Sequence, residues 1–502
     1  MGPFVPPQKM SKATDQKLQR TAFFVALASV ALLIETGCGS GASSSPSAPS
    51  GQAPVATPTP NKLNIVVVMT DDQEAVSARE MPLMQSLIAS QGVTFANAIS
   101  TTPLCGPSRA TIMSGRYAHN HGVLSNDAPL GGYGKYRDTG MEGDSLPVWL
   151  KSAGYRTAYL GKYTNGYGPG WTSKPPGWDD WLAFTEPQAY ANFTFNEDGK
   201  DQTAPSGVYQ TDYLTTRALE YLRRTEERDD QPFFLMVSTY APHNVAKYAA
   251  RHASMFSSNG APRTPAFDEP DVNDKPKHIK RIARFTSSQV TSIDSEYRNS
   301  LRALQAVDEM IEKLVQALTA QGEIDNTAIV FLSDNGLSTG AHRFNDKTAP
   351  YAESLDIPMY IRVPGGPRGV TLPHLVANID LPATIVDWAR IPTPPGIEGR
   401  SLAPLFSAAP LPISAWRGDM LIEYWDNTNP ATTLMPTYQG VRVENGIESS
   451  LYVQHDTTEE EYYDFKKDPY QLDSAVNGNP VEVNKLNARM KTLAACRGAS
   501  CR

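Results

Sequence analysis

Four continuous apolar runs stand out in the pattern of hydrophobic and polar positions. They cover residues 63–69, 155–161, 232–242 and 327–333. Runs of this kind predict strands buried on both faces, as in parallel sheets covered by helices. The runs stop at charged or metal-binding side chains, namely Asp71, Asp72, Lys162, His243, Asp334 and Asn335. Because ligands bind beyond the carboxyl ends of parallel strands, we expect the residues at the ends of all four runs to form one site.

Helical periodicity alternates with these runs. Between residues 301 and 318, apolar side chains recur at i, i+3, i+4 and i+7, and Gly322 supplies a stop. Residues 380–389 predict a second helix, with Asp380 as its N-cap and Pro382 in its first turn. Strands that alternate with helices predict an α/β fold.

The pattern of hydrophobic and polar residues changes after about residue 402. Short alternating runs separated by turns predict a small antiparallel sheet there. We therefore expect a main α/β domain over residues 62–401 and a C-terminal α+β subdomain over residues 402–502. Residues 251–288 are polar and Pro-rich without clear periodicity, which predicts a long surface insertion that shapes access to the site.

The N-terminus has the pattern of an export signal. Basic residues precede an apolar run at residues 22–34, which is shorter than the roughly 20 residues that span a bilayer. The following Gly-Cys resembles a bacterial lipoprotein cleavage site with Cys38 as the lipidated residue, although Glu35 stands where an aliphatic residue is usual. We expect a signal peptide over residues 1–37 and a Ser/Pro-rich tether over residues 38–61. The protein is then exported, as a lipoprotein at an outer membrane surface or in the periplasm, or else plainly secreted.

Composition and charge narrow the range of partners. The 502 residues are 40% hydrophobic and carry a net charge of −8, which indicates a globular chain and argues against nucleic acid as a partner. Of the four cysteines, Cys38 belongs to the export signal. Cys496 and Cys501 predict a small disulfide in an exported protein. Cys105 is left without an evident partner.

The acidic strand ends predict a metal site. Asp71, Asp72, Asp334 and Asn335 offer hard oxygen ligands, which select Ca²⁺ or Mg²⁺ over zinc. Asp-Asp and Asp-Asn-Gly also form turns, so either pair alone has a simpler explanation. Because both pairs follow buried strands, we favour the metal site.

The segment around Cys105 predicts an anion pocket next to that metal. Pro107 suits the first turn of a helix and places Cys105 near the N-terminal end, where backbone N–H groups and the helix dipole favour an anion. The guanidinium of Arg109 matches the oxygens of sulfate or phosphate. Further positive charge and a proton donor would come from Lys162, Lys347 and His243.

These motifs resemble those of a known family. "CGPSRATIMSGR", with "NIVVVMTDDQ", "LGKY", "APH" and "SDNG" in the family's order, is similar to the formylglycine-dependent sulfatases of the alkaline-phosphatase-like superfamily. "GRYAHNHGV", "GKYTNGYG", "LVANIDLPATI" and "CRGASCR" resemble the N-acetylglucosamine-6-sulfatase branch. The resemblance implies a large, mostly parallel mixed sheet flanked by helices, with a smaller C-terminal antiparallel-sheet subdomain.

The resemblance also implies roles for the site residues. A formylglycine-generating enzyme would read Cys105, Pro107 and Arg109 and oxidise Cys105 to Cα-formylglycine. One hydroxyl of the aldehyde hydrate would attack sulfur, and the other would expel sulfate as the aldehyde re-forms. The implied ligands of Ca²⁺, favoured over Mg²⁺, are Asp71, Asp72, Cys105, Asp334 and Asn335. Arg109 would orient residue 105, Lys162 and Lys347 would contact sulfate, and His243 or Lys347 would protonate the leaving alcohol.

One position departs from the family pattern. Many members have a histidine two residues after the lysine of the "GK" motif, where this chain has Thr164. His119, His121, another group or water could substitute, and loop packing is the alternative for both histidines. His342 follows "SDNG" and could reach the site or lie at the surface.

The implied activity is sulfuric ester hydrolysis. The branch suggests a sulfated sugar as substrate, with the 6-sulfate of N-acetylglucosamine in glycosaminoglycan fragments as the leading candidate. A broad arylsulfatase and a phosphonate or phosphate monoester hydrolase remain alternatives. An inactive binding protein would have lost ligands or the modification site, and this sequence retains them. Membrane contact is expected only through a lipid anchor on Cys38.

Overall fold

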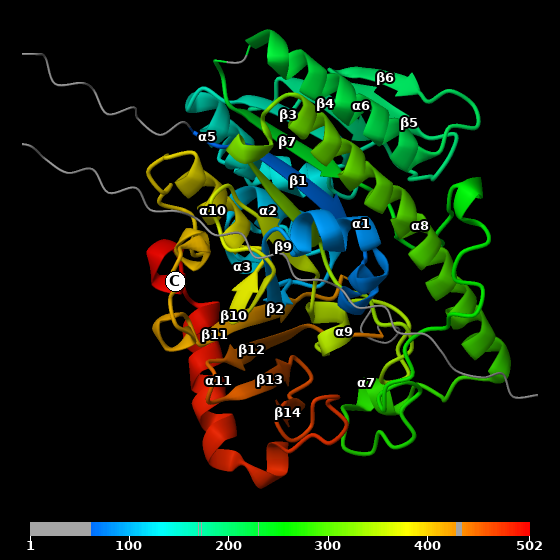
Figure 1. Ribbon diagram of the computed structural model, residues 1–502. Coiled ribbons are helices and arrows are strands. Elements are labelled where there is room, and N and C mark those ends of the chain that lie inside the picture. Colours follow the sequence, from blue (N-terminus) through cyan, green and yellow to red (C-terminus); the bar gives the residue numbers. More distant parts are fainter. Residues whose placement is uncertain (1–61, 169, 172, 229, 428–433) are drawn as a thin grey trace, which may run out of the picture. The chain divides into compact units, whose positions relative to one another are not determined.

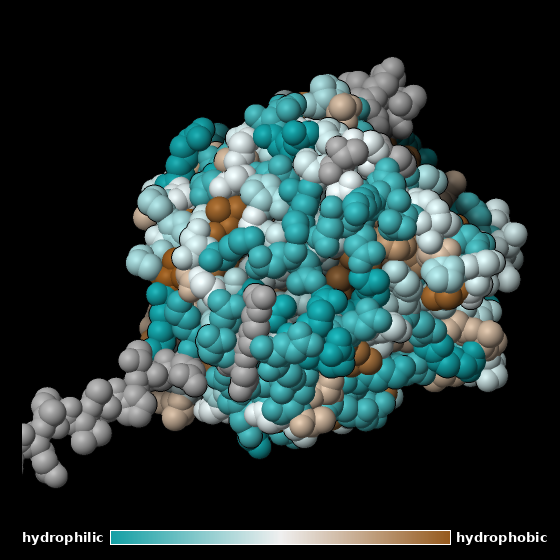
Figure 2. All heavy atoms as spheres, turned by 90° about the horizontal axis from the view of Figure 1, so that it is seen from above, coloured by the Kyte–Doolittle hydropathy of each residue, from teal (hydrophilic) through white to brown (hydrophobic). Residues whose placement is uncertain are grey.

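The computed structural model describes residues 62–168, 170–171, 173–228, 230–427 and 434–502 (Figure 1). The signal peptide, Cys38 and the tether predicted for residues 1–61 lie outside these ranges. Within them, no helix combines the length and apolarity needed to cross a membrane. The face shown in Figure 2 is mostly hydrophilic, with small and separate hydrophobic areas.

A ten-stranded sheet forms the centre of the fold, in the order β10-β2-β9-β8-β1-β7-β3-β4-β5-β6. Its strands are β1 Asn64–Thr70, β2 Val93–Ile99, β3 Arg156–Lys162, β4 Asp180–Phe184, β5 Thr194–Glu197, β6 Lys200–Thr203, β7 Phe233–Ser238, β8 Thr327–Ser333, β9 Met359–Arg362 and β10 Val370–Ala377. The four strands predicted from apolar runs are β1, β3, β7 and β8. They are neighbours and run parallel, which confirms the prediction of a mostly parallel α/β sheet.

Helices cover both faces of the sheet. Successive side chains of β1 alternate between two hydrophobic clusters, with Ile65 in one and Val66 in the other. The first cluster includes residues of α2 (Cys105–Ser114), α5 (Leu146–Ser152) and α10 (Asp380–Trp388). The second includes residues of α6 (Gln210–Thr225) and α8 (Ser287–Ala320). Every residue of β1 is buried, which explains why its sequence reads as one apolar run.

Two helices differ in detail from their predicted bounds. Helix α8, which runs diagonally across Figure 1, begins at Ser287 instead of residue 301. Thr286 caps it in a capping box with Gln289, and this signal lies ahead of the strongly apolar stretch. Asp380 is the first residue of α10 and not its N-cap, because its carboxylate accepts from the backbone N–H groups of Ala377 and Arg400.

A second sheet confirms the prediction of C-terminal antiparallel strands. Its strands β11 (Asp419–Tyr424), β12 (Tyr438–Glu444), β13 (Ser449–His455) and β14 (Glu460–Asp464) pair in sequential order. Helix α11 (Pro480–Ala494) lies beside them (Figure 1), and the Cys496–Cys501 disulfide follows, as predicted. This sheet shares a hydrophobic cluster with Ile99 of β2, so it packs on the main sheet. The boundary at residue 402 stays a prediction.

The predicted insertion is not wholly a surface segment. Short helices are α1 (Pro82–Met84), α3 (Ala118–His121), α4 (Gly132–Asp138), α7 (Lys277–Lys280) and α9 (Ala352–Leu355). Of these, only α7 lies in residues 251–288, which agrees with the weak periodicity there. Glu269, Lys275 and Ile279 are buried, however, so part of this segment packs inside the protein.

Candidate active site

The carboxyl ends of β8, β1, β7 and β3 converge on one site, as predicted. Lys162 is the last residue of β3, and its Nζ lies 2.5 Å from Oδ2 of Asp71, which directly follows β1. His243, from the loop after β7, places Nε2 3.4 Å from Oδ2 of Asp72. After β8, Asn335 donates from Nδ2 to Oδ1 of Asp72 over 2.7 Å. Segments that are far apart in the chain therefore share a single cluster.

Cys105 lies in the middle of this cluster as the first residue of α2. Its Sγ is 3.3 Å from Oδ1 of Asp71, 3.5 Å from Oδ1 of Asp72 and 2.8 Å from Nζ of Lys347. The side chain is fully buried and has no disulfide partner. The predicted helix start near Pro107 is confirmed, because α2 begins at Cys105.

Arg109 ties the strand ends together one helical turn further on. Its Nε donates to Oδ2 of Asp334 over 2.8 Å, and its Nη1 donates to the carbonyl of Lys162 over 2.6 Å and to Oγ of Ser238 over 2.7 Å. Its Nη2 lies 3.7 Å from Oδ1 of Asp71 and has no hydrogen-bond partner. One nitrogen of the buried guanidinium is therefore free to donate to a further acceptor.

Burial and charge set the protonation of the cluster. Burial raises the pKa of the Cys105 thiol, and the carboxylate of Asp72 raises it further, so the thiol stays protonated. Burial alone would also raise the pKa of Asp71. The positive charges of Lys162, His243 and Arg109 offset this and hold that pKa well below its usual range. Asp71 is thus an anion despite complete burial.

The donor set fits a hard divalent cation. Ligand atoms of Asp71, Asp72, Cys105 and His243 lie within 4.8 Å of one another, the only such group in the described part of the chain. The buried Oδ1 of Asn335 has no hydrogen-bond partner. A buried unpaired amide oxygen is costly, and coordination of Ca²⁺ or Mg²⁺ would satisfy it. The sequence predicted Asp71, Asp72, Cys105, Asp334 and Asn335 as metal ligands and His243 as a proton donor, and these roles stay predictions.

Asp334 has a different set of partners from the other carboxylates. Its Oδ1 accepts from the backbone N–H groups of Asp72 and Asn335, over 3.1 and 2.8 Å, and its Oδ2 accepts from Arg109. It lies in the same cluster, as predicted, and its hydrogen bonds connect the loop after β1 with the loop after β8. Its role as a metal ligand stays a prediction.

The histidines that could replace the missing family histidine have packing partners. The Nε2 of His121 is 3.1 Å from Oγ1 of Thr111, and burial lowers the pKa of His121 to about 3. The Nδ1 of His119 is 2.8 Å from Oε2 of Glu423. These contacts favour the packing alternative for both. His342 is 1% exposed, so the surface alternative for it is wrong.

Several supporting residues were not identified from the sequence. Ser238, which bonds Arg109, ends β7 within an apolar run, and its hydroxyl at a strand end was a usable signal. Asn126 accepts through Oδ1 from the backbone N–H of Gly106 over 2.7 Å, next to Cys105. Nothing in the local pattern distinguished Asn126 from an ordinary loop residue.

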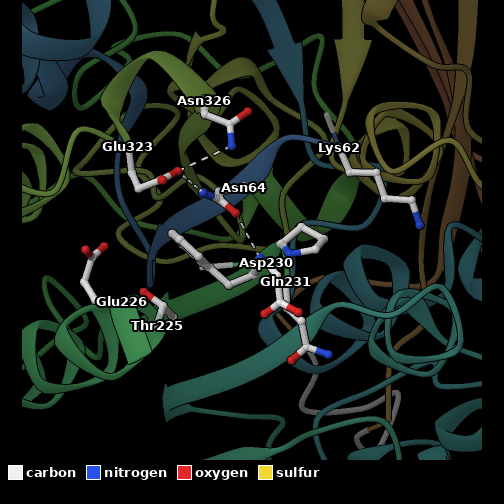
Figure 3. Close-up of a pocket in the computed structure, with 10 residues that line it drawn as sticks. Lys62, Asn64, Thr225, Glu226, Asp230, Gln231, Glu323 and Asn326 are labelled. Carbon is white, nitrogen blue, oxygen red and sulfur yellow. Dashed lines mark hydrogen bonds between the residues drawn. The ribbon is translucent and has the colours of Figure 1, made fainter. Parts of the chain in front are cut away.

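A separate cavity of about 320 Å³ lies at the amino ends of the central strands, opposite the cluster around Cys105 (Figure 3). Asn64, the first residue of β1, lines it and donates to Oε2 of Glu323 over 2.6 Å. Asn326 also reaches that carboxylate, and its bond is drawn in Figure 3. Because this cavity lies at the amino end of β1, it is distinct from the cluster around Cys105.

Comparison with known families agrees with this geometry. A family model described as Sulfatase matches residues 63–391, which is more than half of the chain. The chain belongs to the sulfatase family. A second model, described as N-sulphoglucosamine sulphohydrolase, C-terminal, matches residues 340–496 of this sulfatase. The sulfatase is therefore a sulfuric ester hydrolase, as the motifs predicted.

Relatives of the sulfatase include N-acetylglucosamine-6-sulfatases. The chain is 33% identical to that of Capra hircus over 88% of this chain and 84% of the relative. It is also 33% identical to that of Homo sapiens, over 88% and 86%. An arylsulfatase from Volvox carteri is 30% identical over 87% and 75%. The resemblance to the N-acetylglucosamine-6-sulfatase branch is confirmed.

Solved structures support the same fold for the sulfatase. A protein in complex with its substrate D-glucosamine-2-N,6-O-disulfate is 25% identical, with a TM-score of 0.74 over 86% of this chain and 97% of that one. The phosphonate monoester hydrolase from Silicibacter pomeroyi is 21% identical, with a TM-score of 0.67 over 86% and 94%. The second likeness concerns the fold alone.

Proposed function

We propose that this sulfatase removes sulfate from a sulfated sugar, with the 6-sulfate of N-acetylglucosamine in glycosaminoglycan fragments as substrate. Full-length relatives named for that activity support the sugar, as does the similar structure that holds a 6-O-sulfated glucosamine. The observation that carries the proposal is the position of Cys105. Its side chain lies at a helix N-terminus between two carboxylates and the ammonium of Lys347.

Cys105 is the precursor of the nucleophile in this proposal. A protonated, fully buried thiol is a weak nucleophile and a poor ligand for a hard cation. Conversion to formylglycine by a maturing enzyme that reads Cys105, Pro107 and Arg109 would replace it with an aldehyde. The Sγ atom therefore stands in for the oxygens of the aldehyde hydrate, whose neighbours would be Asp71, Asp72 and Lys347.

The reaction follows from two hydroxyls on one carbon. One hydroxyl of residue 105 releases its proton to solvent, and its oxygen forms a bond to sulfur as the bond from sulfur to the sugar oxygen breaks. The sugar oxygen takes a proton from His243 or Lys347. The second hydroxyl then loses its proton, its oxygen forms the aldehyde, and the carbon–oxygen bond to sulfate breaks. Water restores the hydrate. A serine at this position would lack the second step and would stay sulfated.

The cationic side chains hold the sulfate in this scheme. Lys162 and Lys347 neutralise sulfate oxygens, and the free Nη2 of Arg109 supports residue 105. His243 is 27% exposed while Lys162 is 3% exposed, so the sugar enters on the side of His243. The proton therefore reaches the leaving oxygen from the open side of the site.

The metal in this proposal is Ca²⁺ in preference to Mg²⁺. It would be held by Asp71, Asp72, Asp334, Asn335 and residue 105. When bound, it would supply positive charge that acidifies the attacking hydroxyl and offsets the charge of the sulfate. The unpaired Oδ1 of Asn335 and the close carboxylates support this assignment.

We further propose that the enzyme acts outside the cytoplasm. A relative named extracellular sulfatase in Drosophila melanogaster is 32% identical over 72% of this chain and 33% of the relative. A signal peptide over residues 1–37 and a tether over residues 38–61, with Cys38 as a lipid anchor, are consistent with this.

Substrate comparison tests the proposal. The kcat/KM for N-acetylglucosamine 6-sulfate should exceed that for a nitrophenyl sulfate and for a phenyl phosphonate. The arylsulfatase relative gives the main alternative, which predicts the reverse order for the two sulfates. A Cys105→Ser variant serves as a control, because it should accumulate a sulfated enzyme without turnover. Equal turnover by that variant would rule out formylglycine.

A further inference from the structure

Lys347 owes its place in the site to the turn that precedes it. The turn closes through hydrogen bonds from the N–H of Ser338 to the carbonyl of Asp346 and from the N–H of Gly340 to the carbonyl of Phe344, each 3.0 Å long. Lys347 is the next residue, and its Nζ lies 2.7 Å from Oδ1 of Asp72. Whatever holds this turn therefore also places the ammonium group.

The tip of the turn is held by a buried hydrogen bond between His342 and Glu269. His342 and Arg343 have φ angles of 54° and 58°, a backbone region that non-glycine residues seldom adopt. The Nδ1 of His342 lies 2.7 Å from Oε2 of Glu269, and the two side chains are 1% and 2% exposed. The backbone carbonyl of Glu269 also accepts from Nε of Arg343 over 2.8 Å. Glu269 thus fixes both unusual residues.

Glu269 is itself anchored within the segment predicted as an insertion. Its Oε1 lies 3.6 Å from Nζ of Lys275, which is fully buried. That ammonium donates to the backbone carbonyl of Leu472 over 2.8 Å and to that of Gln471. The tip of the turn is therefore tied to the rest of the fold through a continuous polar chain.

A second contact holds the other side of Lys347. The hydroxyl of Tyr438, on β12 of the C-terminal sheet, donates to the carbonyl of Thr348 over 2.8 Å. Thr348 has a φ of 81° and is the residue directly after Lys347. The backbone on each side of Lys347 is thus held by a tertiary hydrogen bond, from Glu269 to His342 before it and from Tyr438 to Thr348 after it.

We propose that Glu269, acting through His342, and Tyr438 are positioning residues for the ammonium of Lys347. Glu269 bonds His342 and Arg343 in the turn before Lys347, and the hydroxyl of Tyr438 bonds Thr348 directly after it. This inference rests on the proposed function, in which Lys347 contacts sulfate. A loss of either tie should let the ammonium move away from Cys105, and displacements of about 1 Å in a catalytic group can lower rates by about 100-fold.

A double-mutant cycle distinguishes positioning from a general structural role. His342→Asn removes the tie to Glu269 and keeps a residue that tolerates positive φ. We expect kcat/KM to fall by about 10- to 100-fold, as for other supporting residues. In a Lys347→Ala background the same change should lower kcat/KM less than about 2-fold, because the group it positions is gone. Tyr438→Phe should likewise lower kcat/KM when Lys347 is present and have little effect in the Lys347→Ala background.

Matched controls make the result interpretable. Asp268→Asn alters the neighbouring carboxylate, which bonds the N–H of Phe285 and the guanidinium of Arg284, and it should leave kcat/KM within about 2-fold. Thermal unfolding shows that each variant is folded at the assay temperature. Should His342→Asn not fold, Glu269→Gln and Tyr438→Phe carry the same comparison.

Two results would overturn the inference. One is an unchanged kcat/KM in the folded His342 and Tyr438 variants. The other is an equal fold-loss with and without Lys347, which would mean that the ties act elsewhere. The same cycle on the Kd of inorganic sulfate separates this inference from the proposed function. If no sulfate ester is hydrolysed, coupling in sulfate binding still tests the positioning of Lys347.

Discussion

The substitution Lys162→Met probes the buried charge pair at the end of β3. Lys162 is 3% exposed, and Asp71, whose Oδ2 is 2.5 Å from Nζ, is fully buried. Methionine keeps an unbranched apolar side chain but removes the ammonium, so Nη2 of Arg109, at 3.7 Å, becomes the nearest salt-bridge partner of Asp71, with His243 farther away. Removal of one partner of a buried pair costs about 3–5 kcal/mol. We expect the metal-free variant to lose that much free energy of unfolding.

Calcium should restore part of the lost stability. A cation held by Asp71 would take the place of the missing positive charge, and a ligand that binds only the folded state adds stability as its concentration exceeds its Kd. The stabilisation by Ca²⁺ should therefore be larger in Lys162→Met than in the unsubstituted enzyme. With Ca²⁺ present, kcat should still fall by about 10²–10³-fold, because the sulfate loses a preorganised cationic partner.

Urea unfolding with a chelator and with Ca²⁺ measures these effects. Lys151→Met is the matched control, because Nζ of Lys151 lies 2.8 Å from Oδ1 of Asp179 in a pair that is 49% and 36% exposed. Such surface pairs contribute about 0–1 kcal/mol. If the two lysine variants were equally stable in chelator, the buried pair would not hold Asp71. If Ca²⁺ stabilised Lys162→Met less than the unsubstituted enzyme, the idea that Ca²⁺ replaces the missing ammonium would be refuted.

Three further predictions concern stability away from the site. Burial raises the pKa of Asp308 to about 6 from 3.8, although two backbone N–H groups donate to its carboxylate. The protonated side chain therefore contributes to the free energy of unfolding below pH 3.8, and this contribution is lost as the pH rises through 6. Asp308→Asn should remove about 2 kcal/mol of this pH dependence, measured as the difference between urea-unfolding free energies near pH 4 and pH 7. A Cys496→Ser/Cys501→Ser variant should lose about 2 kcal/mol, because the disulfide closes a short loop, and unfolding of the unsubstituted enzyme with and without reductant should give the same difference. Thr286→Ala should lose about 1 kcal/mol by removing the cap of α8, with Thr291→Ala, whose hydroxyl bonds a carbonyl inside that helix, as the control in the same assay.

The centre of the fold and the site could be predicted because burial leaves a strong sequence signal there. Strands β1, β7 and β8 are buried along their whole length, so each reads as a continuous apolar run. Parallel strands point their carboxyl ends to one edge, and this brought Asp71, Lys162 and Asn335 together without knowledge of the strand order. The same reasoning located Cys105 once Pro107 had indicated a helix start.

The edges of the main sheet could not be predicted in the same way. Strand β6 is exposed at every residue, and β2 mixes buried with exposed positions, so neither shows a continuous apolar run. The strand pairing of β9, antiparallel to both β2 and β8, depends on tertiary contacts that leave no local pattern.

The supporting contacts of the site were also hidden from the sequence. Glu269 and His342 lie 73 positions apart, and a glutamate in a polar, Pro-rich stretch looks like a surface residue. Its burial follows from the docking of that stretch on the turn before Lys347. Asp380 was misplaced for a related reason, because its carboxylate bonds the N–H groups of Ala377, at the end of β10, and of Arg400, and not the helix that it begins.

The mass of the peptide that contains residue 105, from enzyme purified from its native host, tests the central claim most directly. Formylglycine predicts a mass about 18 Da below that of the cysteine peptide, a change outside the ordinary oxidation ladder of cysteine. A peptide with an unmodified thiol, from enzyme that is fully active on a sulfated sugar, would contradict the proposed nucleophile.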